Sequence, residues 1–167
     1  QTHSVEGAAL RYFVPAGKPY HRGPECYVPV DAQIQVLMPP QARAGQVLFA
    51  QSATGEYLCE VLPVTTNGVA EPCGYFAAPA DIFACGVCCF IMATGLPPWR
   101  KARPVDTHFK FAFVHGLPRL LKSWGRDLPE TEQQLLVSML RWDPSQRPSA
   151  AACLQRQWFA PLHGVSV

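Results

Sequence analysis

A chain of 167 residues can form one domain with a buried core, and 49% hydrophobic against 16% charged residues excludes an intrinsically disordered chain. The net charge of +2 is too small to indicate nucleic acid or an anionic membrane surface as a partner. The chain begins at Gln1 without a start Met or a signal-like segment, so we expect a fragment or truncated product of a longer polypeptide.

The first half of the chain predicts loop and short strands. Residues 1–25 show no sustained hydrophobic period and are expected to form an extended loop ending at Gly23-Pro24. Residues 26–80 contain β-hairpin signals with glycine in the turn. The expected strands are at 46–51 and 56–62 around the turn Ser52-Ala-Thr-Gly55, with a third short strand at 34–38.

From residue 80 onward the pattern becomes helical. The first stretch, residues 81–94, lies between Pro79 and Gly95, which are typical start and stop residues of a helix. It is apolar nearly all round, so we expect it at the centre of the fold. Further helices are predicted at 105–114, 117–124 and 130–141, followed by a last one capped by Ser149.

Seven cysteines form no regular framework, which predicts a reducing, intracellular and specifically cytoplasmic location. Cys85 and Cys88 are one helical turn apart, but no second Cys pair or His partner has the spacing of a zinc site. We therefore predict no metal, and expect these thiols and Cys89 to pack as small hydrophobic groups.

Four short motifs follow one another: Gly17-Lys-Pro-Tyr-His-Arg-Gly-Pro-Glu25, Asp81-Ile-Phe-Ala-Cys-Gly-Val87, Gly95-Leu-Pro-Pro-Trp99 and Asp143-Pro-Ser-Gln-Arg-Pro-Ser149. In this order they resemble the activation-segment end, the central helix, the loop after it and the closing Arg motif of the eukaryotic protein kinase C-terminal lobe. The strands predicted above form a small β-hairpin insertion in the mainly α fold that the resemblance implies. The resemblance divides the chain into the end of the activation segment (1–25), the insertion with short strands (26–80), the helical core of the lobe (81–163) and a tail (164–167).

The resemblance also implies roles for single residues. Asp81 matches an Asp that braces the catalytic loop from below, although by itself it is an ordinary N-cap or first-turn acid. Glu25 and Arg147 match a buried ion pair, with two unrelated surface charges as the alternative. The other positions of the structural motifs are Gly86, Trp99 and Asp143.

One loop matches the position that holds the substrate residue next to the phosphorylated one. Its matching residues are Gly17, Lys18, Pro19, Tyr20 and Arg22. The family's usual Thr, Tyr and Ala are replaced in this loop by Lys18, His21 and Gly23, and its usual Trp in the central helix by Phe83. These departures leave the substrate preference open and admit an inactive, degenerate kinase.

The motifs that hold ATP do not occur in this sequence: it has no Gly-rich loop, no Val-Ala-x-Lys strand and no Asp-Phe-Gly. Gly125-Arg-Asp-Leu128 mimics a catalytic loop, but it follows Glu25 instead of preceding it, and Glu132 stands where a magnesium-binding Asn belongs. We predict no catalytic, cofactor-binding or metal-binding residue in this chain. ATP and Mg are implied only for a complete kinase, whose N-terminal lobe is missing from the sequence.

The resemblance implies the C-terminal lobe of a Ser/Thr protein kinase-like protein, with ATP-dependent protein phosphorylation only in the complete parent. This portion is expected to serve substrate docking and to act as a scaffold. The alternatives are a pseudokinase-type protein-binding scaffold and an unrelated helical interaction domain. The expected partner is a protein substrate or binding protein. We expect no nucleic acid, and no membrane span because the apolar run 82–93 is short.

Overall fold

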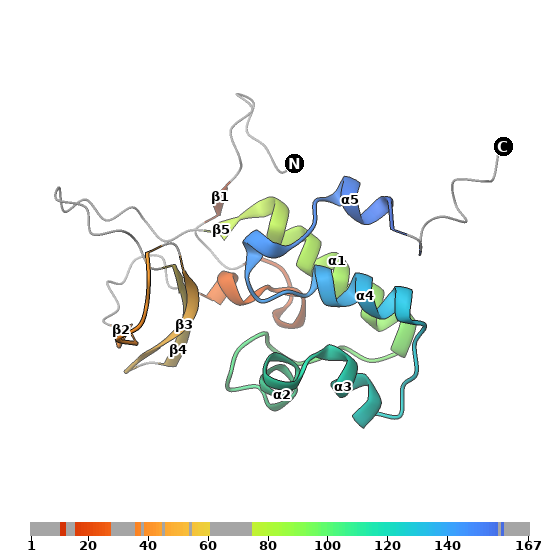
Figure 1. Cartoon of the computed structure of the whole chain (residues 1–167), viewed down its shortest axis with the longest axis horizontal. Helices are drawn as coiled ribbons and strands as arrows, with labels where there is room; N and C mark the ends of the chain where they lie inside the picture. The colour runs from red at the N-terminus through yellow and green to blue at the C-terminus, as the bar shows by residue number, and fades with distance from the viewer. Residues whose placement is uncertain are drawn as a thin grey trace.

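The computed structural model describes residues 11–12, 16–27, 36–37, 39–44, 46–53, 55–60, 75–156 and 158. These residues form a group of packed helices with a small three-stranded sheet beside it (Figure 1). The predicted mainly α fold with a small hairpin is confirmed.

The helices, in chain order, are α1 (Ala77–Thr94), α2 (Thr107–His115), α3 (Leu117–Ser123), α4 (Glu130–Met139) and α5 (Ala150–Leu154). The strands are β1 (Arg11–Tyr12), β2 (Val36–Leu37), β3 (Val47–Ser52), β4 (Gly55–Glu60) and β5 (Tyr75–Phe76). Short 3-10 helices are η1 (Pro19–His21), η2 (Pro24–Tyr27) and η3 (Pro144–Gln146).

The central helix α1 begins earlier than predicted. Its N-cap is Phe76, so Pro79 is the third residue of the helix and does not lie just before it. Proline is tolerated there because the N–H groups of the first turn have no intrahelical acceptor. Asp81 therefore lies in the second turn, and the prediction that it opens the helix is wrong. The helix ends as predicted at Gly95, whose φ of 80° is left-handed.

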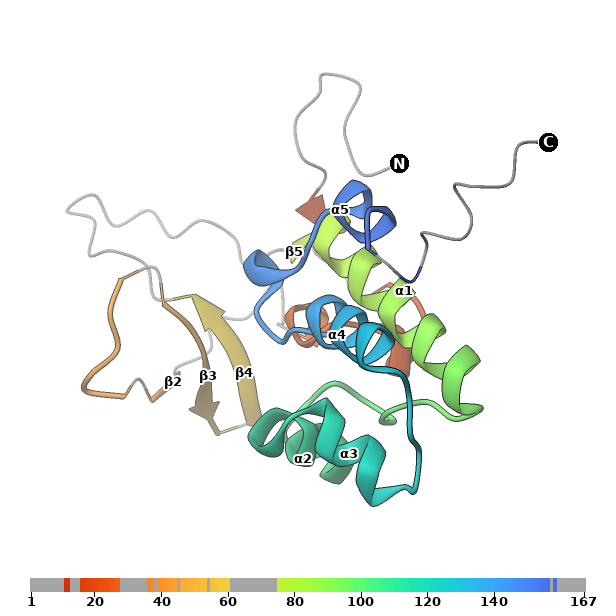
Figure 2. The same cartoon turned by 45° about the vertical axis from the view of Figure 1, so that its right-hand side comes forward.

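Helix α1 supplies the centre of the hydrophobic core. Phe83, Val87 and Phe90 are fully buried and belong to the same cluster as the buried leucines of α3 and Leu136 of α4. Helix α4 lies alongside α1, as two views of the molecule show (Figures 1 and 2). At the crossing, a Cβ atom on Gly86 would lie 2.9 Å from the Cβ of Met139. The close approach of the two helices therefore requires glycine at this position.

Helix α1 is longer than the apolar run that the sequence indicated. It has 18 residues with a mean hydropathy of 1.7, and 44% of them are buried within the structure. By length and composition it meets the criteria for a membrane-crossing helix, so the shortness of the apolar run 82–93 does not decide the question and the absence of a membrane span stays a prediction. The core helix of a globular domain meets the same criteria, and the buried face of α1 belongs to such a core.

The other helices lie close to their predicted ranges. The side chain of Asp106 caps α2, where its Oδ1 accepts from the backbone N–H groups two and three residues later at 3.1 Å each. Helix α4 ends at Met139, two residues before the predicted end. Ser149 caps α5 as predicted, because its Oγ accepts from the backbone N–H of Ala152 at 3.2 Å.

The predicted hairpin is present. Strands β3 and β4 pair antiparallel from Val47–Glu60 to Ser52–Gly55, and β2 pairs antiparallel with β3 to give the order β2-β3-β4. Strand β2 covers Val36–Leu37 of the predicted third strand, whose other residues lie outside the described part of the chain. The predicted end of the second strand, residues 61–62, lies outside the described residues.

A second, two-stranded sheet was not predicted. Strand β1 pairs antiparallel with β5, and the rings of Tyr12 and Tyr75 stack with centroids 5.8 Å apart. Part of the segment 1–25, expected as loop only, is thus a strand. Residues 75–80, which were assigned to the insertion, belong to β5 and α1. Strands of two residues carry no hydrophobic period, so sequence pattern does not reveal them.

An aromatic side chain of the three-stranded sheet, Phe49, packs on rings of the helical part of the chain. The ring centroid of Phe49 in β3 lies 5.4 Å from that of Phe113, 6.1 Å from that of Trp142 and 6.3 Å from that of Phe109. Arg103 adds a polar link, since its Nη2 donates to the backbone carbonyl of Glu56 at 3.2 Å. In Figure 2 the end of β3 and the start of β4 lie on the side of the sheet that is nearer to α2.

Candidate functional site

The segment 16–27 forms a loop that is closed by its own hydrogen bonds. The Arg22 Nε donates to the carbonyls of Ala16 at 3.1 Å and Gly17 at 2.9 Å. The hydroxyl of Tyr27 donates to the carbonyl of Pro19 at 2.6 Å. Gly17 has a φ of 79°, a conformation that favours glycine. The loop therefore has a defined shape that does not depend on a ligand.

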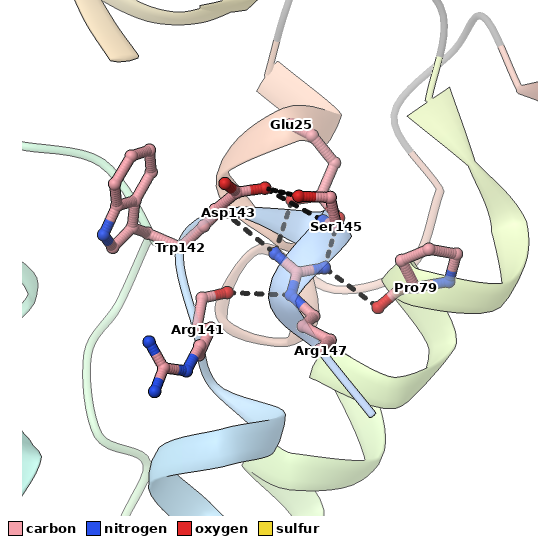
Figure 3. A network of polar contacts seen from close by, with 7 residues as sticks. All are labelled: Glu25, Pro79, Arg141, Trp142, Asp143, Ser145 and Arg147. Atoms are coloured by element: carbon pink, nitrogen blue, oxygen red, sulfur yellow. Dashed lines mark hydrogen bonds and ion pairs between the residues drawn. The ribbon is translucent and has the colours of Figure 1, made fainter. Parts of the chain in front are cut away.

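A buried ion pair ties this loop to the C-terminal part of the chain (Figure 3). The guanidinium of Arg147 donates from Nη2 to Glu25 Oε2 at 2.8 Å and from Nη1 to Glu25 Oε1. Both residues are 8% exposed. The pair that the sequence motifs indicated is thus present, and the alternative of two unrelated surface charges is wrong.

The guanidinium of Arg147 has all of its N–H donors engaged. Besides Glu25, it donates from Nε to the carbonyl of Arg141 at 2.8 Å, from Nη1 to that of Pro79 at 2.9 Å and from Nη2 to that of Trp142 at 3.3 Å. Arginine offers five N–H donors in a planar fork, which suits this arrangement. Figure 3 shows that the side chain joins η2, the start of α1 and the segment after α4.

Phe83 provides an apolar floor for this ion pair. The Cζ of Arg147 lies 4.7 Å from the centre of the Phe83 ring, within cation–π distance. Phe83 also lies near the ring of Trp99, with ring centroids 5.8 Å apart. The sequence singled out Phe83 only as a departure from the family's Trp. Its contact with the guanidinium was missed, because nothing in the sequence places that side chain over an aromatic ring.

Asp143 shapes the turn that presents Arg147. Its buried carboxylate accepts at Oδ1 from the backbone N–H and hydroxyl of Ser145 at 2.9 and 2.7 Å. Its Oδ2 accepts from the side-chain amide of Gln146 at 3.1 Å. These bonds cap η3 and fix the backbone just before Arg147. Asp143 thus acts on the position of the ion pair without contacting Glu25.

Gly23 leaves room for the carboxylate of Glu25. A Cβ atom at this position would lie 2.4 Å from Glu25 Oε2 and 2.7 Å from Oε1. The replacement of the family's usual Ala by glycine is therefore matched to the carboxylate orientation that this structure shows. A methyl group would displace the Glu25 side chain or the loop.

A cavity of about 190 Å³ lies between the loop and the first turns of α1. Of the predicted docking residues, Gly17 and Arg22 line it, whereas Lys18, Pro19 and Tyr20 do not. Lys18 and Pro19 are exposed, and Tyr20 packs against the main core. The sequence prediction named these five together, and the structure brings only two of them to the cavity.

Asp81 lines the same cavity with an exposed side chain. The catalytic loop that the family resemblance gives it as a partner does not occur in this sequence. The cavity also contains His21 and Tyr75, and the hydroxyl oxygen of Tyr75 accepts from the backbone N–H of Ala16 at 3.2 Å. Tyr75 was missed because it lies in an unpredicted two-residue strand. The cavity thus combines cationic, anionic and hydroxyl groups.

The cysteines beside the cavity are not activated nucleophiles. Burial, followed by the nearby carboxylate of Glu25, raises the pKa of Cys26 to about 12. Partial burial also raises the pKa of Cys89 and of Cys85, but Cys85 is itself exposed, as is Cys88, so the expectation that these two thiols pack as small hydrophobic groups is wrong. Cys88 is exposed, and its Sγ lies 3.8 Å from Nδ1 of His21. Within the described ranges, no three His, Cys, Asp or Glu side chains gather into a metal-binding group.

The tetrapeptide Gly125-Arg-Asp-Leu128 ends helix α3. Gly125 has a φ of 65° and its N–H bonds the carbonyl of Lys122 at 3.0 Å, while the N–H of Arg126 bonds that of Leu121 at 3.0 Å. This pair of bonds is the Schellman arrangement of a helix C-terminus. The sequence interpretation that this motif is not a catalytic loop agrees with its place in the fold.

A family model described as the protein kinase domain matches residues 54–159. The calcium and calcium/calmodulin-dependent serine/threonine-protein kinase of Lotus japonicus is 30% identical over 90 residues, 51% of this chain and 16% of the relative. CBL-interacting protein kinase 3 of Oryza sativa subsp. japonica is 27% identical over 119 residues, 71% of this chain and 24% of the relative. Serine/threonine-protein kinase ICK of Mus musculus is 28% identical over 132 residues, which are 65% of this chain and 20% of the relative. The chain spans less than a quarter of the length of these relatives.

Proposed function

Since the chain belongs to the protein kinase family, as its motifs predicted, we propose that it forms the substrate-docking floor of the C-terminal lobe of a Ser/Thr kinase-like protein. The docking surface is the cavity between the loop 16–27 and the start of α1. A protein segment, either a substrate or a regulatory partner, is the proposed ligand. The proposed location of the protein is intracellular, like the reducing compartment that its cysteine usage favours.

The observation that carries this proposal is the fixed loop. Glu25 holds one end of it to Arg147 in a buried bidentate pair, and Arg22 closes the other end onto Gly17. A surface fixed in advance binds a flexible segment at a lower entropic cost than a mobile loop. The cavity at the junction offers Arg22 and Asp81, so it can engage both acidic and basic groups of a peptide.

The phosphoryl-transfer reaction is proposed only for the complete parent protein. ATP and Mg would be held by residues outside this sequence, which lacks the Lys-bearing strand, the catalytic Asp and the Asp-Phe-Gly motif. No residue of this chain is assigned to ATP or metal. The chain would supply the docking surface and the helical support beneath it.

Peptide binding tests this proposal. We would screen a Ser/Thr-containing peptide library against the isotope-labelled chain and follow backbone amide shifts. Binding should shift the amides of Gly17 and Arg22, and Arg22→Ala should weaken it. The exposed Arg119→Ala variant on α3 should bind as the unchanged chain does. Peptides that bind without shifting the loop, or that bind Arg22→Ala equally well, would exclude docking at this cavity.

A pseudokinase-type scaffold is the second candidate function. It is favoured by the replacement of family residues in the docking loop by Lys18, His21 and Gly23, together with Phe83 in the central helix. The sequence and the phosphorylation activity of the complete parent protein distinguish an active kinase from a pseudokinase-type scaffold. A Lys-bearing strand, a His-Arg-Asp loop and an Asp-Phe-Gly motif upstream, with measurable phosphorylation of a protein substrate, support the active kinase. Their absence supports the scaffold.

A further inference from the structure

A second cavity of about 180 Å³ lies between α2, α4 and the loop before α2. It shares no lining residue with the docking cavity. Its walls are mainly aromatic and aliphatic, and include Trp99, Phe109, Phe113, Val137, Leu140 and Trp142. Nothing in the proposed docking function uses this cavity.

Trp99, one of the residues that line the cavity, has a side-chain hydrogen-bond donor without an acceptor among the described residues. The side chain of Trp99 is 3% exposed, and its Nε1 has no acceptor within the described part of the chain. Indole offers a single N–H donor, and a buried donor without an acceptor is costly and rare in folded proteins. An acceptor atom supplied by a ligand would satisfy this group.

Three of the lining residues also pack on an aromatic ring that lies outside the cavity. Phe49 of β3 packs on Phe109, Phe113 and Trp142, all three of which line the cavity. The Phe109–Phe113 pair is stacked and Trp142 meets Phe113 edge to face, so the walls present both ring faces and ring edges. The volume also fits one ring, because an apolar cavity of about 150 Å³ in another protein takes up benzene.

We propose that this cavity binds a single aromatic ring carrying one acceptor oxygen, a phenol of the tyrosine type, whose oxygen accepts from Trp99 Nε1. The exposed Arg141 also lines the cavity, and its Nη1 donates to the side chain of Gln146. This guanidinium disfavours a cationic ligand and tolerates the partial negative charge of a phenol oxygen. The site requires no ATP and no other part of a kinase.

The test is a titration of the full 167-residue chain, labelled with nitrogen-15, with p-cresol and with toluene. The two probes have the same ring and methyl group, and only p-cresol has the oxygen. Four tryptophan indole N–H signals are expected, and the Trp99→Phe variant identifies that of Trp99. We expect p-cresol to move this signal downfield. We also expect it to bind about fivefold more tightly than toluene, which is the ratio of dissociation constants that one modest hydrogen bond produces.

Trp99→Phe keeps a ring and removes the donor, so in this variant the two probes should bind equally. Ala112→Leu, which fills the cavity from α2, should abolish binding while the circular dichroism spectrum stays unchanged. N-acetyltyrosinamide is a third probe. Its binding at the same signal identifies a protein tyrosine as the source of the phenol, whereas binding of p-cresol alone identifies a free small molecule. Equal affinity of both probes for the unchanged chain, or a Trp99 signal that stays in place, would overturn the proposal.

Discussion

At the scale of single residues, the Glu25–Arg147 pair shows what sequence can and cannot predict. The spacing within two short motifs was sufficient to match the two side chains across 122 positions. The surroundings of the pair were not predictable, since the carbonyls of Pro79 and Arg141 and the ring of Phe83 are brought together only by packing. The motifs therefore predicted the two partners of the ion pair, but the other groups in contact with the pair depend on how the whole chain folds.

We expect Arg147→Ala to lower the free energy of unfolding by about 3 kcal/mol, because it leaves the buried carboxylate of Glu25 without its partner. Urea denaturation followed by circular dichroism measures the change. Arg141→Ala is the matched control, since its side chain is exposed and the carbonyl that contacts Arg147 is retained. Equal stabilities of the two variants would contradict a buried role for the pair.

The raised pKa of Cys26 predicts a thiol that stays unreactive at pH 8. With a pKa near 12, its thiolate fraction at pH 8 is about a thousand-fold below that of a thiol with the ordinary pKa of 9.0. Treatment of the native protein with iodoacetamide, followed by peptide mass spectrometry, should leave Cys26 unmodified and label the exposed Cys88. Labelling of both at similar rates would contradict the burial of Cys26.

The same shift predicts a change of stability with pH. The folded state holds the Cys26 proton more tightly than the unfolded state, so this thiol stabilises the fold fully below its ordinary pKa of 9.0. That contribution is lost as the pH rises from 9.0 toward about 12. In urea denaturation between pH 8 and pH 11, Cys26→Ala should lose less stability over this interval than the unchanged chain.

At the scale of elements, a strand or helix was predictable when it was long and when glycine or proline marked its ends correctly. The β3–β4 hairpin was found because two strands of six residues surround a turn that contains glycine. Strands β1 and β5 were not found, since two residues are too few to show alternation. The start of α1 was placed too late because Pro79 was interpreted as a boundary, although the first turn of a helix accepts proline.

We expect the hairpin to be docked on the helices and to depend on Phe49. A lone hairpin is marginal in water, so β3 and β4 should be protected from amide hydrogen exchange only while Phe49 packs on α2. Phe49→Ala should increase exchange across Val47–Ser52 and Gly55–Glu60 but leave α1 protected. The control is Gln51→Ala, an exposed residue two positions further along the same strand. Fast exchange of the hairpin in the unchanged chain would refute the docking.

At the scale of the whole molecule, the helices pack as a mainly α domain of the protein kinase family, and the sequence contains none of the family's nucleotide-binding motifs. The order of four motifs predicted this much from sequence, because each belongs to a different element of one lobe. The sequence did not predict which of the proposed docking residues line the cavity. Gly17 and Arg22 line it, whereas Lys18 and Pro19, from the same loop, are exposed and lie outside it.

The chain should therefore not bind ATP–Mg in the micromolar range, since phosphate and Mg ligands are missing from its sequence. Isothermal titration calorimetry with ATP and MgCl2 should give no heat beyond dilution. A complete, active kinase domain titrated in parallel is the positive control. Saturable, Mg-dependent binding by this chain would contradict the proposed division of roles between it and its parent.

The distance along the chain between Glu25 and Arg147 also has a kinetic consequence. Joining them closes a loop of 122 positions, and contacts of such long range form late, after the local helices. Interactions absent from the folding transition state act on the unfolding rate and leave the folding rate nearly unchanged. Stopped-flow measurements should then show Arg147→Ala unfolding faster and refolding at the original rate. In that case the pair sets the lifetime of the folded lobe, a property separate from how readily the lobe folds.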